Sequence, residues 1–186
     1  MKKIFTKASL LALLASAVVS CGGSATPETV TLSAEGLSCL TQGAPLSSIP
    51  DQCEGLYDRV EQTTQEDMGD TYTLYTFYAG DQKVAEIPAY GETIDLLMVY
   101  APNVVTPDGV YPGMQVSELL TKPGLVALTM DGFEYELNGY RFRVNGMNDS
   151  GAQKLSDSFA QGTEPVLGAE DFERNRRLES TYNVDI

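Results

Sequence analysis

Apolar residues are most densely patterned in one stretch near the middle of the chain. Between Ile94 and Tyr100, apolar side chains fall on both sides of an extended backbone, and only Asp95 interrupts one side. A strand covered on both faces has this pattern, so we expect a central strand here. Pro102 ends it, because proline has no N–H to give to a strand ladder.

A short helix and a turn-rich loop follow this strand. Val116, Leu119 and Leu120 are spaced as one apolar stripe of a helix, which the Pro123-Gly124 pair terminates. We interpret the preceding loop as a tight strand-to-helix connection. The alternative is a recognition loop, and its candidate binding residues are Thr106, Asp108, Gly109, Tyr111 and Gly113.

The second half of the chain contains a strong hairpin signal at Asn138-Gly139, which favours a two-residue type I′ turn. Such a turn pairs Glu134 with Arg143, Tyr135 with Phe142, Glu136 with Arg141 and Leu137 with Tyr140. The aromatic and aliphatic residues then share the core face. The two opposite-charge pairs share a face that we expect to be solvent-exposed, and we interpret both arginines as ladder partners rather than ligand-binding groups.

An earlier hairpin, Thr71–Tyr78 with Lys83–Ile87, follows a polar segment, Gln62–Asp70, that we interpret as a loop. A short-helix outline at Gly43–Pro50 resembles the one at Gly113–Leu119, so each half of the chain has a short helix, a strand and a hairpin. We therefore predict an α+β fold, mainly antiparallel sheet with short helices. It would comprise two similar half-units, about 37–101 and 102–186, in one domain.

Three further elements complete the prediction. Thr29–Leu32 is a candidate first strand, Ala152–Phe159 a candidate helix, and Leu178–Ile186 a candidate last strand. By the duplication, the last strand would occupy the position that Ile94–Tyr100 holds in the first half.

The first twenty residues have the features of a targeting segment rather than of the fold. Three lysines precede an apolar run, Ala8–Val19, which is too short to span a bilayer. Residues 21–27 are small and polar, as in a tether. The globular domain is expected to cover residues 28–186.

The end of the apolar run, Val18-Val19-Ser20-Cys21, resembles the lipobox of bacterial lipoproteins. The resemblance implies cleavage before Cys21, lipidation of its thiol and, because Gly22 rather than aspartate follows, an outer-membrane destination. An ordinary secretory signal with a chance cysteine is the alternative. The segment YAPNVVTPDGVYPGMQVSELL also resembles uncharacterised envelope lipoproteins of Bacteroidetes-type bacteria, which implies an α+β fold and no particular activity.

With Cys21 set aside for lipid, two cysteines remain, Cys39 and Cys53. An oxidising compartment would join them in a disulfide. A redox-active pair is the alternative, although the spacing is not Cys-x-x-Cys.

The charge balance narrows the class of partner. Without Lys2, Lys3 and Lys7 the chain has 9 Lys and Arg against 26 Asp and Glu, a net charge of −17. This charge argues against nucleic acid or anionic lipid as a partner, and it permits a basic protein. The alternative explanation is that the charge only keeps the protein soluble.

Candidate chemistry is sparse. The chain contains no histidine, which excludes Ser-His-Asp and Cys-His sites and histidine-ligated metals. We predict no cofactor and no metal; the polar run Asn145–Asp149 lacks the twelve-residue calcium loop.

The sequence thus favours a non-enzymatic envelope lipoprotein that binds or scaffolds another envelope component. One alternative is an inhibitor of a basic periplasmic hydrolase such as lysozyme. Another is a hydrolase that uses a pair of carboxylates.

Overall fold

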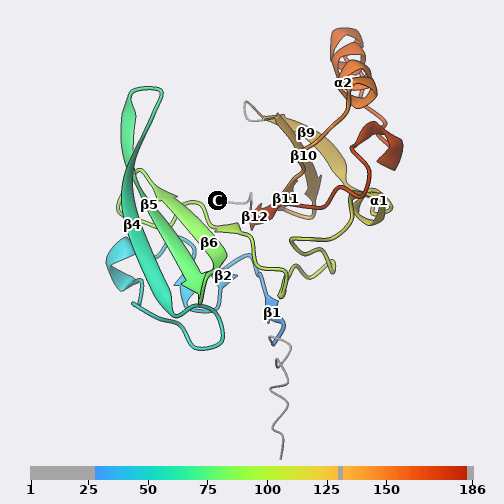
Figure 1. Ribbon diagram of the computed structural model, residues 1–186. Helices are drawn as coiled ribbons and strands as arrows, with labels where there is room; N and C mark the ends of the chain where they lie inside the picture. The colour runs from blue at the N-terminus through green and yellow to red at the C-terminus, as the bar shows by residue number, and fades with distance from the viewer. Residues whose placement is uncertain (1–27, 130–131, 184–186) are drawn as a thin grey trace, which may run out of the picture.

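The protein is an α+β structure built on one large antiparallel sheet (Figure 1). The computed structural model describes residues 28–129 and 132–183, with the backbone alone for Leu125–Thr129 and 132–133. Eight strands are ordered β4-β5-β6-β7-β12-β11-β10-β9. Their bounds are β4 Arg59–Asp67, β5 Asp70–Ala79, β6 Gln82–Ala89, β7 Met98–Val99, β9 Leu125–Thr129, β10 Gly132–Leu137, β11 Tyr140–Arg143 and β12 Ser180–Asn183.

Small elements surround this sheet. Two short strand pairs are β1 (Val30–Thr31), parallel to β8 (Val104–Val105), and β2 (Gly36–Leu37), antiparallel to β3 (Leu40–Thr41). The helical segments are η1 (Leu46–Ser48), α1 (Val116–Leu119), α2 (Asp149–Gln161) and η2 (Ala169–Asp171). Thus the first predicted strand and the short helices are confirmed, although most of these elements span a few residues.

One face of the sheet carries the hydrophobic core. Direct register partners form a row across seven strands: Val60, Phe77, Ala85, Val99, Thr181, Phe142 and Tyr135. The small elements contribute further members of the same cluster, among them Leu32, Leu37, Leu40, Val104, Val116 and Leu119. Burying these side chains together is the main stabilising contribution to such a sheet.

The predicted central strand is correct in place and wrong in length. β7 lies between β6 and β12 at the middle of the sheet, but only Met98–Val99 is paired there. Ile94 instead exchanges backbone hydrogen bonds with the segment before η1: its N–H donates to Ala44 O at 2.9 Å, and its carbonyl accepts from Gly43 N at 2.8 Å. This distant partner holds the first part of the predicted strand outside the sheet.

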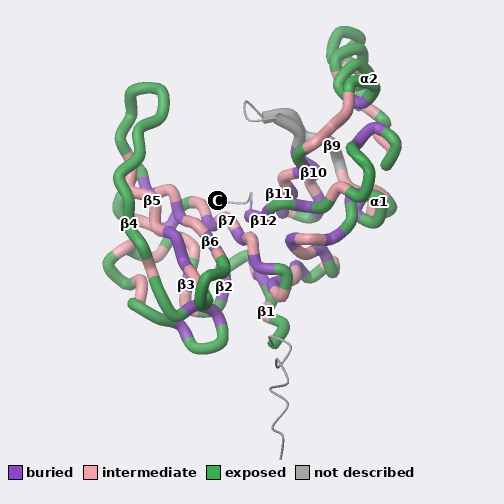
Figure 2. Tube along the Cα trace, in the orientation of Figure 1, coloured by how far each residue is buried: buried purple, intermediate pink, exposed green. Residues whose placement is uncertain are grey.

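The polar segment Gln62–Asp70 is not a loop, so that prediction is wrong. Most of it belongs to the edge strand β4, which pairs with β5 from Arg59↔Tyr78 to Asp67↔Asp70. Figure 2 shows that β4 is exposed along most of its length, whereas much of β5 is partly or fully buried. A strand exposed on both faces needs no alternation of apolar and polar residues, so the pattern used to recognise strands is missing.

The register predicted for the second hairpin is confirmed at all four pairs. Tyr135, Leu137, Tyr140 and Phe142 are buried as expected. However, the opposite face is not uniformly solvent-exposed, because Glu134 is only 1% exposed. The last strand accounts for the difference: β12 packs beside β11 and brings Tyr182 against Glu134.

The predicted helix and last strand are also present. The helix is longer than expected, from Asp149 to Gln161, and begins after an Asn148 side chain that accepts a hydrogen bond from Gly151 N. Asn148 thus acts as an N-cap, so the polar run before the helix is a helix start. Residues 184–186, the predicted end of the last strand, lie outside the described residues, as do the predicted signal segment, tether and Cys21.

Candidate functional site: a pocket beside the disulfide

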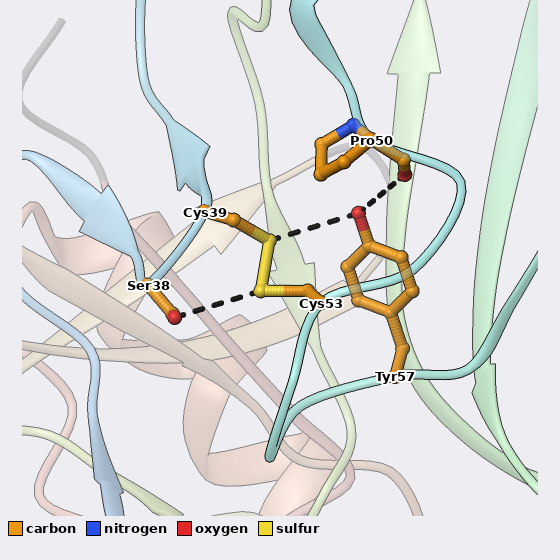
Figure 3. Close-up of a disulfide and its surroundings, with 5 residues drawn as sticks. All are labelled: Ser38, Cys39, Pro50, Cys53 and Tyr57. Carbon is orange, nitrogen blue, oxygen red and sulfur yellow. Dashed lines mark hydrogen bonds between the residues drawn. A yellow bond between two sulfur atoms is a disulfide. The ribbon is translucent and has the colours of Figure 1, made fainter.

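Cys39 and Cys53 form a disulfide, as predicted, and its Cα atoms are 6.3 Å apart. It joins the turn between β2 and β3 to the loop that precedes β4 (Figure 3). Ser38 lies on one side, with its hydroxyl 3.6 Å from Cys53 Sγ. Since a disulfide sulfur has no hydrogen, Ser38 is the donor.

Tyr57 lies on the other side of the disulfide. Its hydroxyl donates to Pro50 O at 2.8 Å and lies 3.6 Å from Cys39 Sγ. Its ring packs against Phe77 of β5, with centroids 4.8 Å apart. Burial, with a smaller effect of the Asp51 carboxylate, raises the pKa of Tyr57 to about 12, so the hydroxyl stays protonated as a donor.

Backbone hydrogen bonds close the loop from Cys53 to Asp58 on itself. Cys53 N donates to Tyr57 O at 2.9 Å, and Tyr57 N donates back to Cys53 O at 3.0 Å. Asp58 continues this closure into the sheet, because its N–H donates to Tyr78 O and its carboxylate accepts from Gly80 N at 2.8 Å. The disulfide and these bonds hold the loop in one conformation before any ligand arrives.

A pocket of about 640 Å³ opens beside this loop. Three parts of the chain form its walls: the loop itself, the turn end of the β5–β6 hairpin, and the segment after β7. The lining residues are Gln52, Cys53, Glu54, Gly55, Leu56, Tyr57, Asp58, Ala79, Gln82, Val84, Ala101 and Asn103. The volume falls in the range of about 300–1,000 Å³ that is typical of small-molecule sites.

The pocket has an apolar interior and a polar, acidic rim. Leu56, Val84 and Ala101 are buried, with 6%, 2% and 2% of their surfaces exposed. Glu54 and Asp58 are exposed, and Gln52 and Gln82 add amide groups. An interior of this kind can hold an apolar stem, while the rim can bind a polar or charged end.

The sequence singled out the two cysteines but not this pocket. Its walls come from segments as far apart in the sequence as Gln52 and Asn103, and no local pattern relates them. Within the loop, Gly55 adopts a φ of +76°, a conformation that favours glycine.

The loop Thr106–Gly113, for which a recognition role was the alternative interpretation, forms hydrogen bonds within itself and with neighbouring segments. Thr106 is buried. Its N–H donates to Val110 O, its carbonyl accepts from Gly109 N, and its hydroxyl accepts from Val110 N. Asp108 accepts from Asn138 Nδ2 at 2.8 Å, and its carbonyl accepts from Lys122 Nζ at 2.9 Å.

The end of this loop is anchored in the same way. Gly113 has a φ of +95° and pairs with Leu178 and Arg177 through its N–H and carbonyl, while Tyr111 packs against the core. These contacts are those of a strand-to-helix connection.

A second polar cluster lies on the face of the sheet opposite the core row. The buried Glu134 carboxylate accepts from the Tyr182 hydroxyl and lies 3.5 Å from Arg143 Nη2 and 4.0 Å from Arg141 Nη1. Burial, followed by the hydrogen bond to Glu134, raises the pKa of Tyr182 above its ordinary value. The charges here satisfy one another, which is the behaviour expected of a structural network.

A matching arrangement lies at β6, which is separated from β12 by β7. Tyr100 donates to Glu86 Oε2 at 2.7 Å, and Lys83 Nζ lies 3.0 Å from Glu86 Oε1. Lys83 also stands 3.7 Å above the Tyr100 ring. The arginines of the second hairpin are thus engaged with carboxylates of the neighbouring strand β10, and this lysine is engaged with a carboxylate of its own strand, β6.

The polar run before α2, considered above as a calcium loop, caps the helix instead. In residues 28–129 and 132–183, no group of three Cys, Asp and Glu side chains could hold a metal ion.

One buried carboxylate lies close to α2. Asp171 is buried and binds Gly168 N at 2.9 Å and Lys154 Nζ at 2.8 Å. Although burial alone would raise the pKa of Asp171, these hydrogen bonds lower it on balance.

Among the described residues, no helix is long and apolar enough to cross a membrane.

Comparison with known proteins gives a fold relationship. No protein family matches the sequence, and no curated protein is significantly similar to it. A similar solved structure is that of the uncharacterized protein yfeY from Escherichia coli, with a TM-score of 0.56 and 19% identity. The similarity covers 84% of this chain and 99% of yfeY, so the two chains share a fold over most of their lengths.

Proposed function

We propose that the protein is a non-enzymatic binding module, anchored in the outer membrane by lipid on Cys21, that holds another component of the envelope. The observation that carries the binding role is the pocket of about 640 Å³ beside the disulfide. Its wall is fixed by the Cys39–Cys53 bond, its interior is apolar, and its rim bears carboxylates. Rigid sites of this composition bind ligands without paying a large ordering entropy.

The anchor would place the pocket close to the membrane. Asn103 on the rim donates from its side chain to Glu28 O at 3.0 Å, so the pocket adjoins the start of the described chain. Seven peptide units connect Cys21 to Glu28 and span at most about 25 Å. A partner bound there would therefore be held near the bilayer surface.

Lipidation is tested directly. Cells expressing the full chain are labelled with an alkyne analogue of palmitate, and the purified protein is examined by mass spectrometry. We expect the label at Cys21 and partition into the membrane fraction, and Cys21→Ser should abolish both. An unmodified mature N-terminus would contradict the anchor.

Binding is tested by recovery of a stoichiometric partner with the tagged, lipidated protein from solubilised membranes. Ala79→Trp, at the exposed end of β5, should obstruct the pocket and reduce recovery. Ala160→Trp, exposed on α2, is the matched control and should not. Equal recovery with both variants would show that the partner binds elsewhere, and turnover of a substrate without any partner would contradict the proposal.

The two half-units are part of the same proposal. Residues 37–101 and 102–186 would descend from one duplicated unit. The supporting observation is the strand order, in which β4-β5-β6-β7 is followed by β12-β11-β10-β9, so that the last strand of each run meets the other at the centre. An experimental structure in which the two runs do not superpose strand for strand would contradict this origin.

A second candidate function, inhibition of a basic hydrolase, is favoured by the hairpin of β4 and β5. Beyond Thr73, where pairing with β6 begins, this hairpin extends as two strands alone (Figure 1). Its apex presents Met68, 84% exposed, next to Glu66, Asp67 and Asp70. An exposed apolar tip flanked by carboxylates suits a basic cleft with an apolar floor.

Lysozyme provides a simple test of inhibition. We expect slower lysis of cell walls by lysozyme at low salt when the protein is added, and a weaker effect for Met68→Gly. Unchanged lysis rates would contradict this candidate function.

No contact among the described residues favours the carboxylate-dependent hydrolase, because the two carboxylates of the pocket are exposed on its rim.

A further inference from the structure

The composition of the pocket indicates what kind of group it accepts. Among the described residues that line it, none is Lys or Arg, whereas two are carboxylates, Glu54 and Asp58. Arg59, next along the chain, is engaged with other partners: it pairs with Glu61, lies 4.2 Å from the Tyr78 ring centroid and donates from Nη2 to Gly80 O at 3.5 Å. The pocket is therefore negative, in a chain whose net charge is itself negative.

A concave surface of one sign of charge concentrates ions of the opposite sign. The low-dielectric walls focus the field of Glu54 and Asp58 into the opening. The two carboxylates would repel an anionic ligand. A simple metal ion would lack a third protein ligand, since no such group occurs in residues 28–129 and 132–183.

The apolar interior adds a second requirement. Leu56, Val84 and Ala101 offer no hydrogen-bond partner from their side chains, so an aliphatic segment suits this part of the wall. Long basic side chains combine such a stem with a cationic end, and they bury the stem readily along apolar surfaces.

We propose that the pocket binds the side chain of an arginine residue of a partner protein, with the methylene stem against Leu56, Val84 and Ala101 and the guanidinium between Glu54 and Asp58. The planar guanidinium can form two parallel hydrogen bonds with a carboxylate, which a lysine ammonium cannot. The amides of Gln52 and Gln82 supply further acceptors at the rim. This inference rests on the proposed binding function and names the chemistry of its partner.

The preformed loop favours such recognition. Gly55 stands at the rim with open space beside its Cα, so the backbone leaves the entrance free. Asp58 keeps its position through the hydrogen bond from Gly80 N. One of its oxygens thus stays oriented, and the residue remains exposed in the lining of the pocket.

The test uses N-acetylarginine amide and its neutral isostere N-acetylcitrulline amide as probes. Each is titrated into the full mature chain and followed by amide chemical shifts. With the arginine probe we expect saturable shifts confined to residues 52–58, 79–84 and 101–103. The citrulline probe should bind at least about tenfold more weakly. Added salt should weaken the arginine complex.

The double variant Glu54→Gln, Asp58→Asn should lower the affinity for the arginine probe by about tenfold or more. Asp58→Asn retains an oxygen that can accept from Gly80 N, so the loop should remain folded. The matched control, Glu66→Gln with Asp67→Asn, makes the same change in net charge at the hairpin apex and should leave the affinity unchanged.

Three results would overturn the inference: equal binding of the two probes, shifts spread over the acidic surface, or an equal loss in the control variant. Each leaves the proposed function standing, because that function is judged by recovery of a partner with Ala79→Trp and Ala160→Trp. Conversely, loss of all partner recovery alongside arginine-specific shifts would contradict the function and not the site.

Discussion

Glu134 places a carboxylate on β10, next to the edge strand β9, with only 1% of its surface exposed. Arg143, Arg141 and the hydroxyl of Tyr182 surround it. Removing one member of a buried ionic group is costly because the remaining charges stay desolvated without a partner. The neighbouring Glu136 lies on the same strand but is far more exposed, and it pairs with Arg141 at 3.3 Å.

This contrast predicts different costs for the same chemical change. Glu134→Gln should lower the free energy of unfolding by about 2–4 kcal/mol, whereas Glu136→Gln should lower it by about 0–1 kcal/mol. Urea unfolding of the two variants provides the measurement. Similar losses in both would mean that Glu134 behaves as a surface residue.

Two tyrosines of the same face should resist ionisation. Burial, with hydrogen bonds to Glu134 and Glu86, raises the pKa values of Tyr182 and Tyr100 above the ordinary 10.0. A raised folded-state pKa means that their stabilising contribution is complete below pH 10.0 and is lost as the pH rises above it.

Ultraviolet titration of the phenolate should therefore show delayed ionisation of these two tyrosines, as of Tyr57, coupled to unfolding. Tyr182→Phe should remove one delayed step. Ionisation of all tyrosines near their ordinary pKa, with the fold intact, would contradict this assignment.

At the scale of elements, α2 is held to the C-terminal segment by close backbone contact. A Cβ on Gly151 would lie 2.4 Å from Asp171 O and 2.7 Å from Met147 Cγ. In an exposed helix, replacing glycine with alanine stabilises by about 1 kcal/mol. Here the clash of the added Cβ with the Asp171 carbonyl oxygen should make the same replacement destabilising.

Gly151→Ala should therefore lower the free energy of unfolding by about 1–3 kcal/mol. Ser156→Ala, exposed on the same helix, serves as the control and should raise it slightly or leave it unchanged. Thermal unfolding followed by circular dichroism distinguishes the two. A gain in stability for Gly151→Ala would show that α2 is not packed against Asp171.

The disulfide connects two elements, the β2–β3 turn and the pocket loop. Its cysteines are separated by 14 positions, and closing a loop of this size stabilises a fold by about 3 kcal/mol in the chain-entropy model. Cys39→Ser with Cys53→Ser should lose about that much in guanidinium unfolding. The wild type should lose the same amount under reducing conditions, and an unchanged midpoint would contradict a stabilising role.

At the scale of the whole molecule, a narrow seam joins the two four-strand runs. β7 contributes only Met98 and Val99, which pair with Glu86 and Ala85 on one side and with Tyr182 and Thr181 on the other. Yet the core cluster includes residues from both runs, from Phe77 to Phe142. Shared burial should therefore make unfolding cooperative despite the short pairing.

Val99→Ala at this seam, fully buried in the wild type, should lower the free energy of unfolding by about 2 kcal/mol. The loss should appear equally in the hydrogen exchange of β5 and of β10, since both runs would open together. Faster exchange confined to one run would indicate two independently unfolding bodies.

Much of the fold could be predicted because it depends on neighbours in the chain. The Asn138-Gly139 turn sets the register from Leu137↔Tyr140 to Glu134↔Arg143 by local backbone geometry. The Val116–Leu119 helix follows from apolar spacing and a proline-glycine stop, and the disulfide follows from the count of cysteines.

What only the tertiary structure decided concerns residues whose surroundings come from distant segments. β4 lacks the alternation that identifies a strand, Ile94 bonds to Ala44 instead of entering the sheet, and β12 buries Glu134. The pocket likewise depends on distant segments, since its walls come together only when the sheet has formed. Local sequence sets which conformations a segment favours, whereas burial and concavity depend on segments far away in the chain.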